Sequence, residues 1–180
     1  MEPRRPLPFD PIATARAHWA ANDWHDAAPG MAAVTSVMRA HQLMLAKVEK
    51  ALRPFGLTFA RYEVLMLLSF TRQGEIPMAR ASSRLQVHPT SITNAVDRLE
   101  EAGLVRREPH PDDRRTTLIR ITDEGRRIAR SATDEVNEQV FAALPIAEED
   151  IEQLVAVLTR FRSAAGDFTD SQAPSGPAGN

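Results

Sequence analysis

The chain has 180 residues, of which 43% are hydrophobic and 26% are charged, and its formal net charge is −2. This length and composition predict a folded core with appendages rather than a disordered chain. The absence of cysteine excludes disulfides, thiolate zinc sites and a cysteine nucleophile. No apolar run approaches the roughly 18 residues of a membrane-spanning helix, and the first residues form no signal-peptide core, so we expect a cytoplasmic protein.

Residues 1–30 predict an N-terminal extension that carries one short helix. Asp10 and Pro11 suit the N-cap and the first helical position, so the helix should cover residues 12–21. Residues 22–30 end in a Pro-Gly pair and are expected to form a connector.

Residues 31–75 predict two helices of a core and dimerisation region. The first runs from Met31 to Arg53 and is stopped by Pro54, and Thr58 caps the second, which Gly74 ends. Apolar residues recur at helical spacing in both. The stripe of the first consists of Val34, Met38, Leu45, Val48 and Leu52, with His41 filling one gap, and that of the second consists of Tyr62, Leu65, Met66 and Leu68.

Residues 76–121 predict two short helices followed by a hairpin. One helix covers residues 77–85, and the other opens at His88-Pro89 and ends at Gly103, a good residue for a helix C-terminus. On the second helix, 100° per residue separates two faces. The core face should hold Ile92, Ala95, Val96, Leu99 and Ala102, and the outer face Thr90, Thr93, Asn94, Asp97 and Glu101, with Ser91 and Arg98 at its edge.

The hairpin is expected to have strands at 104–108 and 116–121, joined by a protruding loop rich in Pro, Asp and Arg. Residues 122–166 then predict two dimerisation helices. The first is capped by Thr122 and runs to about residue 143, and the second carries the stripe Ile151, Leu154, Val155, Leu158 and Phe161. Residues 167–180, rich in Ser, Pro and Gly, predict a disordered tail.

The fold class that follows is mainly α with a small β wing, in which a winged helix-turn-helix lobe joins a helical dimerisation region. Residues 72–130 hold 12 Arg against 9 Asp and Glu, a net charge of +3, whereas the rest of the chain has a net charge of −5. A local excess of arginine suits a phosphate-binding face, although solvated surfaces can show the same difference.

The second helix of such a pair fits the major groove, which is about 12 Å wide. Its candidate DNA-binding residues are His88, Thr90, Ser91, Thr93, Asn94 and Arg98. The amides of Thr90 and Ser91 should hold a phosphate, Asn94 can pair with adenine and Thr93 can touch a thymine methyl. At the hairpin tip, Arg114 and Arg115 suit the minor groove, where an Asp two residues away can hold an arginine fork.

Three alternatives stand beside this interpretation. A polar helix face and an Asp-Asp-Arg-Arg turn are usually only solvated, and a winged helix can bind proteins instead of DNA. An enzyme is disfavoured because the sequence lacks a nucleophile elbow, a phosphate loop or an HExxH motif. The five histidines share no ligand spacing, so we expect neither a metal nor a cofactor.

The run LQVHPTSITNAVDRLEEAGLV (85–105) resembles the recognition helix of MarR-type (multiple antibiotic resistance) regulators. PDDRR (111–115) and ITDEG (121–125) resemble that family's wing and the start of its next helix. The resemblance implies a homodimer, a two-fold, pseudo-palindromic operator and repression relieved by a small acidic or phenolic ligand. It also implies that Asp113 orients the wing, Arg115 enters the minor groove and Arg114 contacts phosphate.

In this family the effector pocket lies where the dimerisation helices meet the DNA-binding lobe, which makes Trp19, His41, Tyr62, Glu63 and Met66 the candidates for a small acidic or aromatic effector. Packing roles are open for each of them. The extra helix with Trp19 is similar to the urate-responsive subfamily, which has Asp where this chain has Glu63.

Overall fold

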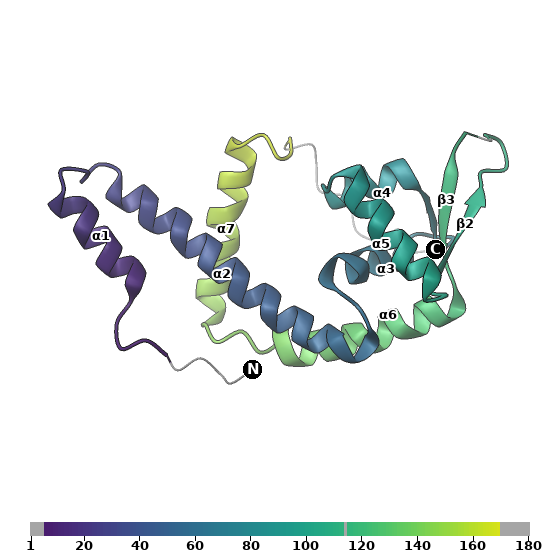
Figure 1. Cartoon of the computed structure of the whole chain (residues 1–180), viewed down its shortest axis with the longest axis horizontal. Coiled ribbons are helices and arrows are strands. Elements are labelled where there is room, and N and C mark those ends of the chain that lie inside the picture. The colour runs from purple at the N-terminus through teal and green to yellow at the C-terminus, as the bar shows by residue number, and fades with distance from the viewer. Residues whose placement is uncertain (1–5, 114, 170–180) are drawn as a thin grey trace. The chain divides into compact units, whose positions relative to one another are not determined.

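The computed structural model describes residues 6–113 and 115–169 (Figure 1). The expected fold class is confirmed, because helices dominate and the sheet is small, three-stranded and antiparallel. The chain forms two compact units, one up to Ala142 and one from Ala143 onward. The helices are α1 (Pro11–Ala21), α2 (Ala28–Leu52), α3 (Phe59–Ser69), α4 (Met78–Leu85), α5 (Pro89–Glu101), α6 (Asp123–Val136) and α7 (Glu148–Ala164), and the strands are β1 (Glu75–Pro77), β2 (Val105–Pro109) and β3 (Thr117–Ile121).

The N-terminal extension folds back as α1 against the first half of α2 (Figure 1). The Asp10 carboxylate accepts a hydrogen bond from the amide of Ile12 at 2.9 Å, which is the expected N-cap. The rings of Trp19 and Trp24 pack with centroids 5.4 Å apart. The connector is shorter than predicted, because α2 already begins at Ala28 and Pro29 lies in its first turn, where the missing amide hydrogen is not needed.

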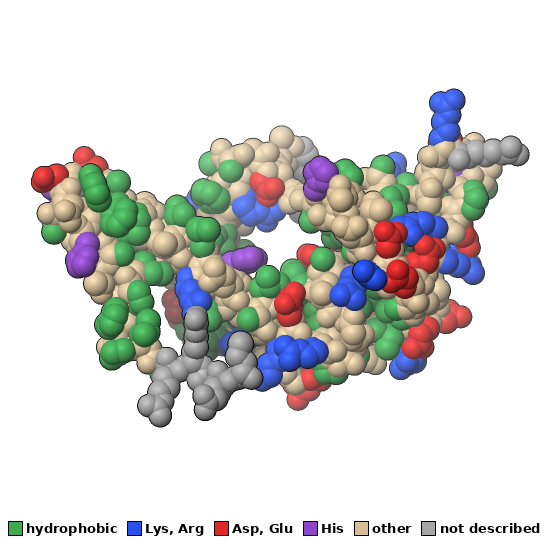
Figure 2. Space-filling model, in the orientation of Figure 1, with side chains coloured by type: hydrophobic (Ala, Val, Ile, Leu, Met, Phe, Trp, Pro, Cys, Tyr) green, Lys and Arg blue, Asp and Glu red, His purple; other side chains and the backbone are tan. Residues whose placement is uncertain are grey.

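The long helix α2 is buried only near its ends. Val48, Ala51 and Leu52 belong to the core, whereas Val34 and Met38, at the start of the same apolar stripe, are each 61% exposed. Figure 2 shows hydrophobic side chains at the surface of α1 and α2. The predicted stripe therefore covers the chain's own core over only part of its length.

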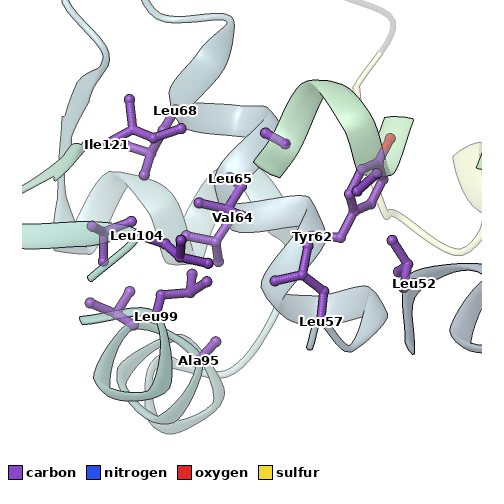
Figure 3. Close-up of a cluster of buried hydrophobic side chains, with 14 of the residues drawn as sticks. Leu52, Leu57, Tyr62, Val64, Leu65, Leu68, Ala95, Leu99, Leu104 and Ile121 are labelled. Atoms are coloured by element: carbon purple, nitrogen blue, oxygen red, sulfur yellow. The ribbon is translucent and has the colours of Figure 1, made fainter. Parts of the chain in front are cut away.

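The hydrophobic core is built around α3 (Figure 3). Its side chains Val64, Leu65 and Leu68 are at most 1% exposed, and the helix packs with α5 and β3. Burial of each such side chain contributes about 1.5–3 kcal/mol relative to exposure. Further buried residues come from every neighbouring element: Leu52, Ile92, Val96, Leu99, Leu104, Ile119, Ile121, Ala129, Ala132 and Val136.

The sheet has the order β1-β3-β2, and β1 is absent from the sequence prediction. Ile119 of the central strand β3 pairs with Ile76 of β1 at one edge and with Arg107 of β2 at the other. Residues 75–77 end in proline and are too short for an alternating pattern, so only the pairing with β3 makes them a strand. The two wing strands are confirmed within one residue of their predicted starts.

The first turn of α6 is locked against the start of β2. The hydroxyl of Thr122 donates to the carbonyl of Gly103 at 2.9 Å, and its amide donates to the carbonyl of Leu104 at 3.0 Å. A Cβ on Gly125 would lie 2.1 Å from the Leu104 carbonyl oxygen, so only glycine permits this approach. At its other end α6 passes into a π-helical turn, Asn137–Phe141.

The second unit consists of α7 and the residues around it. None of the residues of α7 is buried, and Leu154, Val155 and Phe161 are 44%, 55% and 69% exposed. After α7 the chain turns at Gly166, and Asp167 pairs with Arg162 at 2.6 Å. The rest of the tail, residues 170–180, lies outside the described residues. Within the described part of the chain, no helix is both long and apolar enough to cross a membrane.

Candidate nucleic-acid interface

Helix α5 separates its two faces largely as the sequence predicts. Ile92, Ala95, Val96 and Leu99 are at most 8% exposed and join the core. The prediction for Ala102 is wrong: it is exposed, because it is the C-cap residue beyond the last packed turn. The candidate DNA-binding side chains of the helix, Thr90, Ser91, Thr93, Asn94 and Arg98, are all exposed.

His88 caps the N-terminus of α5, a role that the sequence analysis did not assign to it. Its Nδ1 accepts a hydrogen bond from the amide of Thr90 at 3.3 Å, and its carbonyl accepts from the amide of Ser91 at 2.9 Å. In the free protein both amides are therefore already paired, and their contact with a phosphate stays a prediction. A phosphate would have to compete with the side chain and the carbonyl of His88 for them.

The side chains further along the outer face differ in how far they are already engaged. The hydroxyl of Thr93 donates to the carbonyl of Pro89 at 3.0 Å, so it is already engaged within the helix. Arg98 pairs with Glu101 at 2.8 Å, but both side chains are about two-thirds exposed, so solvent weakens the pair. The Asn94 amide and the Ser91 hydroxyl make no hydrogen bond to any described residue, and they are the groups most available to a ligand.

The turn between α4 and α5 is closed by side-chain and backbone hydrogen bonds. Gln86 takes the left-handed conformation with φ of 53°, which ends α4. The hydroxyl of Ser82 donates to the carbonyl of Val87 at 2.8 Å, and the Val87 amide donates to the Ser82 carbonyl at 3.3 Å. These bonds fix the angle at which α5 leaves α4.

The wing is a hairpin whose tip is ordered by Asp113. Its carboxylate accepts from the backbone amide of Arg115 at 3.0 Å and from the hydroxyl of Thr116 at 2.7 Å. These two bonds hold the pKa of Asp113 below its ordinary value, the Thr116 bond having the larger effect. The sequence predicts that an Asp holds an arginine fork, whereas among the described residues Asp113 holds the backbone of the turn. Arg115 is exposed at the tip, and Arg114 lies outside the described residues.

Arg107 joins the wing to the recognition helix, and the sequence analysis missed it. From β2 its guanidinium reaches both Asp97 and Glu100 of α5, and its amide donates to the Glu100 carboxylate at 2.8 Å. Only a quarter of its side chain is exposed. Burial lowers the pKa of Arg107, but the hydrogen bonds and the charges of Asp97 and Glu100 together raise it above its ordinary value. Arg107 therefore neutralises two acids of α5 and clamps α5 to β2.

The opposite face of the sheet carries an ion-pair ladder across all three strands. Arg120 of β3 pairs with Glu75 of β1 and, at 3.0 Å, with Glu108 of β2, which also pairs with Arg106 at 2.7 Å. Figure 2 shows basic and acidic side chains intermingled over the region of α5 and the base of the wing. Much of the arginine excess is thus neutralised locally, and Arg115 is among the arginines that remain without an acidic partner in the described chain.

Helices α4 and α5 and the wing together line an open hollow of about 760 Å³. Thr93 of α5 and Arg115 of the wing both line it, so the predicted major-groove and wing residues border a common space. An arginine at the wing tip beside an exposed polar helix face can contact the DNA backbone and the bases at one time.

The effector candidates separate into two groups. Tyr62, Glu63 and Met66 of α3 line one open apolar hollow of about 500 Å³, whereas Trp19 and His41 do not border it. The Tyr62 hydroxyl and Thr133 Oγ1 of α6 lie 3.1 Å apart. Burial raises the pKa of Glu63. Within residues 6–113 and 115–169, no group of three His, Asp or Glu side chains could hold a metal ion.

Comparison with known proteins agrees with this geometry. The family model described as "MarR family" matches residues 57–117. Sco5413, a MarR family transcriptional regulator from Streptomyces coelicolor, is 46% identical and aligns with a TM-score of 0.72 over 79% of this chain and 99% of its own. CouR from Rhodococcus jostii, solved with p-coumaroyl-CoA, is 32% identical over 74% of this chain and 91% of its own, with a TM-score of 0.62.

A third solved structure, Sco3205 from Streptomyces coelicolor in complex with DNA, is 26% identical over 79% of this chain and 89% of its own, with a TM-score of 0.64. The first two curated relatives, both HTH-type transcriptional regulators of Bacillus subtilis, are 32% and 30% identical, and the matches span 54% and 65% of their lengths.

The fold and the exposed polar face of α5 define a winged helix-turn-helix protein, of the class that regulates transcription. The chain belongs to the MarR family of transcriptional regulators. These relatives are regulators, not enzymes.

Proposed function

We propose that this protein is a ligand-relieved repressor, active in the cytoplasm, that binds a pseudo-palindromic operator as a homodimer. One observation carries the proposal: the outer face of α5 presents the unpaired Asn94 amide and Ser91 hydroxyl beside a wing that ends in the exposed Arg115. MarR family structures include a DNA complex, that of Sco3205.

The DNA contacts divide between helix and wing. Asn94 and Thr93 read base edges in the major groove, and Arg98 exchanges its exposed pair with Glu101 for a guanine or a phosphate. His88, Thr90 and Ser91 contact the backbone at the start of the helix. Arg114 and Arg115 contact the minor groove and its phosphates, with Asp113 ordering the turn between them and β3.

Exposed apolar side chains support the dimer. On α7 the exposed fractions are 44% for Leu154, 55% for Val155 and 69% for Phe161. On α2, Val34 and Met38 are each 61% exposed. A monomer rarely leaves such stripes in water. A two-fold pair would carry two recognition helices about one turn of DNA apart, which is what a pseudo-palindromic operator requires. In this assignment residues 31–75 and 122–166 dimerise and residues 76–121 bind DNA.

The effector site is the hollow on α3 that Tyr62, Glu63 and Met66 line. CouR was solved with p-coumaroyl-CoA, which supports a small-molecule effector for this chain as well. A ligand that moves α3 away from α6 would also displace the recognition helix α5, because α3 packs directly on α5.

Fluorescence anisotropy with DNA from upstream of the protein's own gene tests the function. Specific binding should weaken about tenfold or more between 50 and 200 mM salt. Asn94→Ala should lower operator affinity by about 1–3 kcal/mol and relax base choice at one position per half-site. Equal loss on random DNA would refute base reading by Asn94, and no specific complex at all would favour a protein-binding winged helix.

Arg115→Ala separates the wing from the helix in the same assay. It should weaken binding to all sequences similarly and flatten the salt dependence by about one unit of slope. An unchanged slope would show that Arg115 does not contact phosphate.

A further inference from the structure

An unpartnered carboxylate lies in the apolar hollow on α3. Ten residues line this hollow, all within the described parts of the chain, and Glu63 is the only charged one. The walls are aromatic or aliphatic, with polar atoms from Tyr62, Thr133 and Asn137. Its volume of about 500 Å³ is that of a site for a small organic molecule.

Glu63 differs in this respect from the partly buried acids of α5 and the sheet. Glu75, Asp97 and Glu100 each pair with an arginine, and Glu108 pairs with two. Glu63 makes no hydrogen bond or ion pair with any described residue. Its pKa is raised by burial, and no neighbouring charge offsets that effect.

The basic residues on α3 and α6 form no ion pair with Glu63 in the described parts of the chain. Arg61, on α3 itself, donates to the hydroxyl of Thr58 and to the carbonyl of Gly56. Arg126 and Arg130 of α6 do not line the hollow on α3: with Asp134 they line an adjoining, smaller hollow of about 270 Å³, which shares Met66 and Thr133 with the first. A carboxylate that loses water without gaining a partner is destabilised, and a ligand with a positive nitrogen would relieve this.

Four of the residues that line the hollow with Glu63 are aromatic. Phe59 and Tyr62 are stacked, with centroids 6.4 Å apart and planes 26° apart, and the other two are Phe70 and Phe141. The faces of aromatic rings attract cations, and their surfaces take up flat apolar groups.

We propose that this hollow binds a planar aromatic amine or a related lipophilic organic cation, whose positive nitrogen pairs with Glu63 while its rings pack on Phe59, Tyr62 and Phe141. The inference rests on the proposed function in that it takes this hollow as the effector site. It replaces the acidic ligand class with a basic one, because an anion would place a second negative charge beside Glu63.

Three probes of nearly the same shape test the ligand class on the full-length protein by calorimetry at pH 7.5: 1-naphthylmethylamine, 1-naphthalenemethanol and 1-naphthoate. The amine should bind about tenfold more tightly than the alcohol, and the acid should bind most weakly. Glu63→Gln, which keeps the shape of the side chain, should remove the preference for the amine over the alcohol. Glu49→Gln, on the exposed surface of α2, should retain it.

Tighter binding of the acid than of the amine overturns the inference, and so does an amine preference that survives in Glu63→Gln. Binding of none of the three probes by a protein that still binds its operator also overturns it, while leaving the repressor intact. If the amine binds with the expected preference but does not release operator DNA, the ligand class stands and the ligand-relieved part of the proposed function fails.

Discussion

Helices α5 and α7 have the same kind of sequence pattern and opposite surroundings. Both carry an apolar stripe on one face and polar residues on the other. In α5 the stripe is buried, with Val96 and Leu99 at most 1% exposed, so the free face is polar. In α7 no residue is buried and Phe161 is 69% exposed, so the free face is apolar. The sequence pattern predicts that an apolar helix face will be buried, but it does not tell whether the same chain or another one buries it.

The largest expected effect follows from the buried face of α5. Leu99→Ala should lower the free energy of unfolding by about 2–5 kcal/mol, because it leaves a cavity among fully buried neighbours. Urea denaturation at a fixed protein concentration measures this. Ser91→Ala, on the exposed face of the same helix, should change stability by less than about 0.5 kcal/mol. Similar losses for both variants would mean that the two faces of α5 do not differ as described.

The exposed face of α7 gives the next effect. Leu154→Glu should weaken self-association by about 2 kcal/mol or more, since it would bury an unpaired charge in the proposed interface. Sedimentation equilibrium over a range of concentrations measures the dimer dissociation constant. The matched control is Gln153→Glu, which adds the same charge on the polar side of the helix. A dimer equally strong in both variants would show that this stripe is not the interface.

A smaller effect is expected at the clamp between α5 and the wing. Arg107→Leu should reduce operator affinity by about 1–2 kcal/mol, because Asp97 and Glu100 lose their cation and β2 loses its attachment to α5. The cost of Arg115→Ala should then be smaller in the Arg107→Leu background than in the native protein. Arg106→Leu, on the opposite face of the same strand, should leave that cost unchanged. Additive losses for Arg107 and Arg115 would show that the clamp does not position the wing.

The smallest effect concerns the wing tip. Asp113→Asn keeps the shape of the side chain but leaves one acceptor oxygen for the two donors of Arg115 and Thr116, so operator affinity should fall about two- to threefold. Because the pKa of Asp113 is lowered in the folded protein, its stabilisation of the turn is complete above the ordinary pKa of 3.8 and is lost only as the pH falls through the lower folded value. Wild-type affinity measured between pH 5 and 8 should therefore show no step from this group.

The order of helices and wing strands could be predicted, because local signals mark their boundaries. Asp10, Thr58 and Thr122 each cap a helix as expected, and Gly103 follows α5 with a positive φ of 70°. The start of α2 was placed too late, because a Pro-Gly pair reads as a break in a sequence although proline is tolerated in a first helical turn.

The features that depend on distant parts of the chain could not be predicted. Strand β1 exists only through its pairing with β3, and the bonds of Arg107 to Asp97 join residues ten positions apart on different elements. The role of His88 was within reach, since the residue before Pro89 stands at the N-cap position, but histidine is not a common cap. Asp113 lies in the predicted turn, but its bond to Arg115 is to the backbone amide rather than to the guanidinium.

The fixed first turn of α6 has a mechanical consequence. Gly125 lies so close to the Leu104 carbonyl that this end of the helix cannot slide without carrying the start of β2 with it. Eight residues further along, about 12 Å away at 1.5 Å per residue, Thr133 of the same helix borders the hollow on α3. Because α6 is a rigid helix that is fixed at its first turn, a molecule that displaces Thr133 would also tilt the wing. The close contact of Gly125 with the Leu104 carbonyl, which a side chain would prevent, is the point about which the helix would turn.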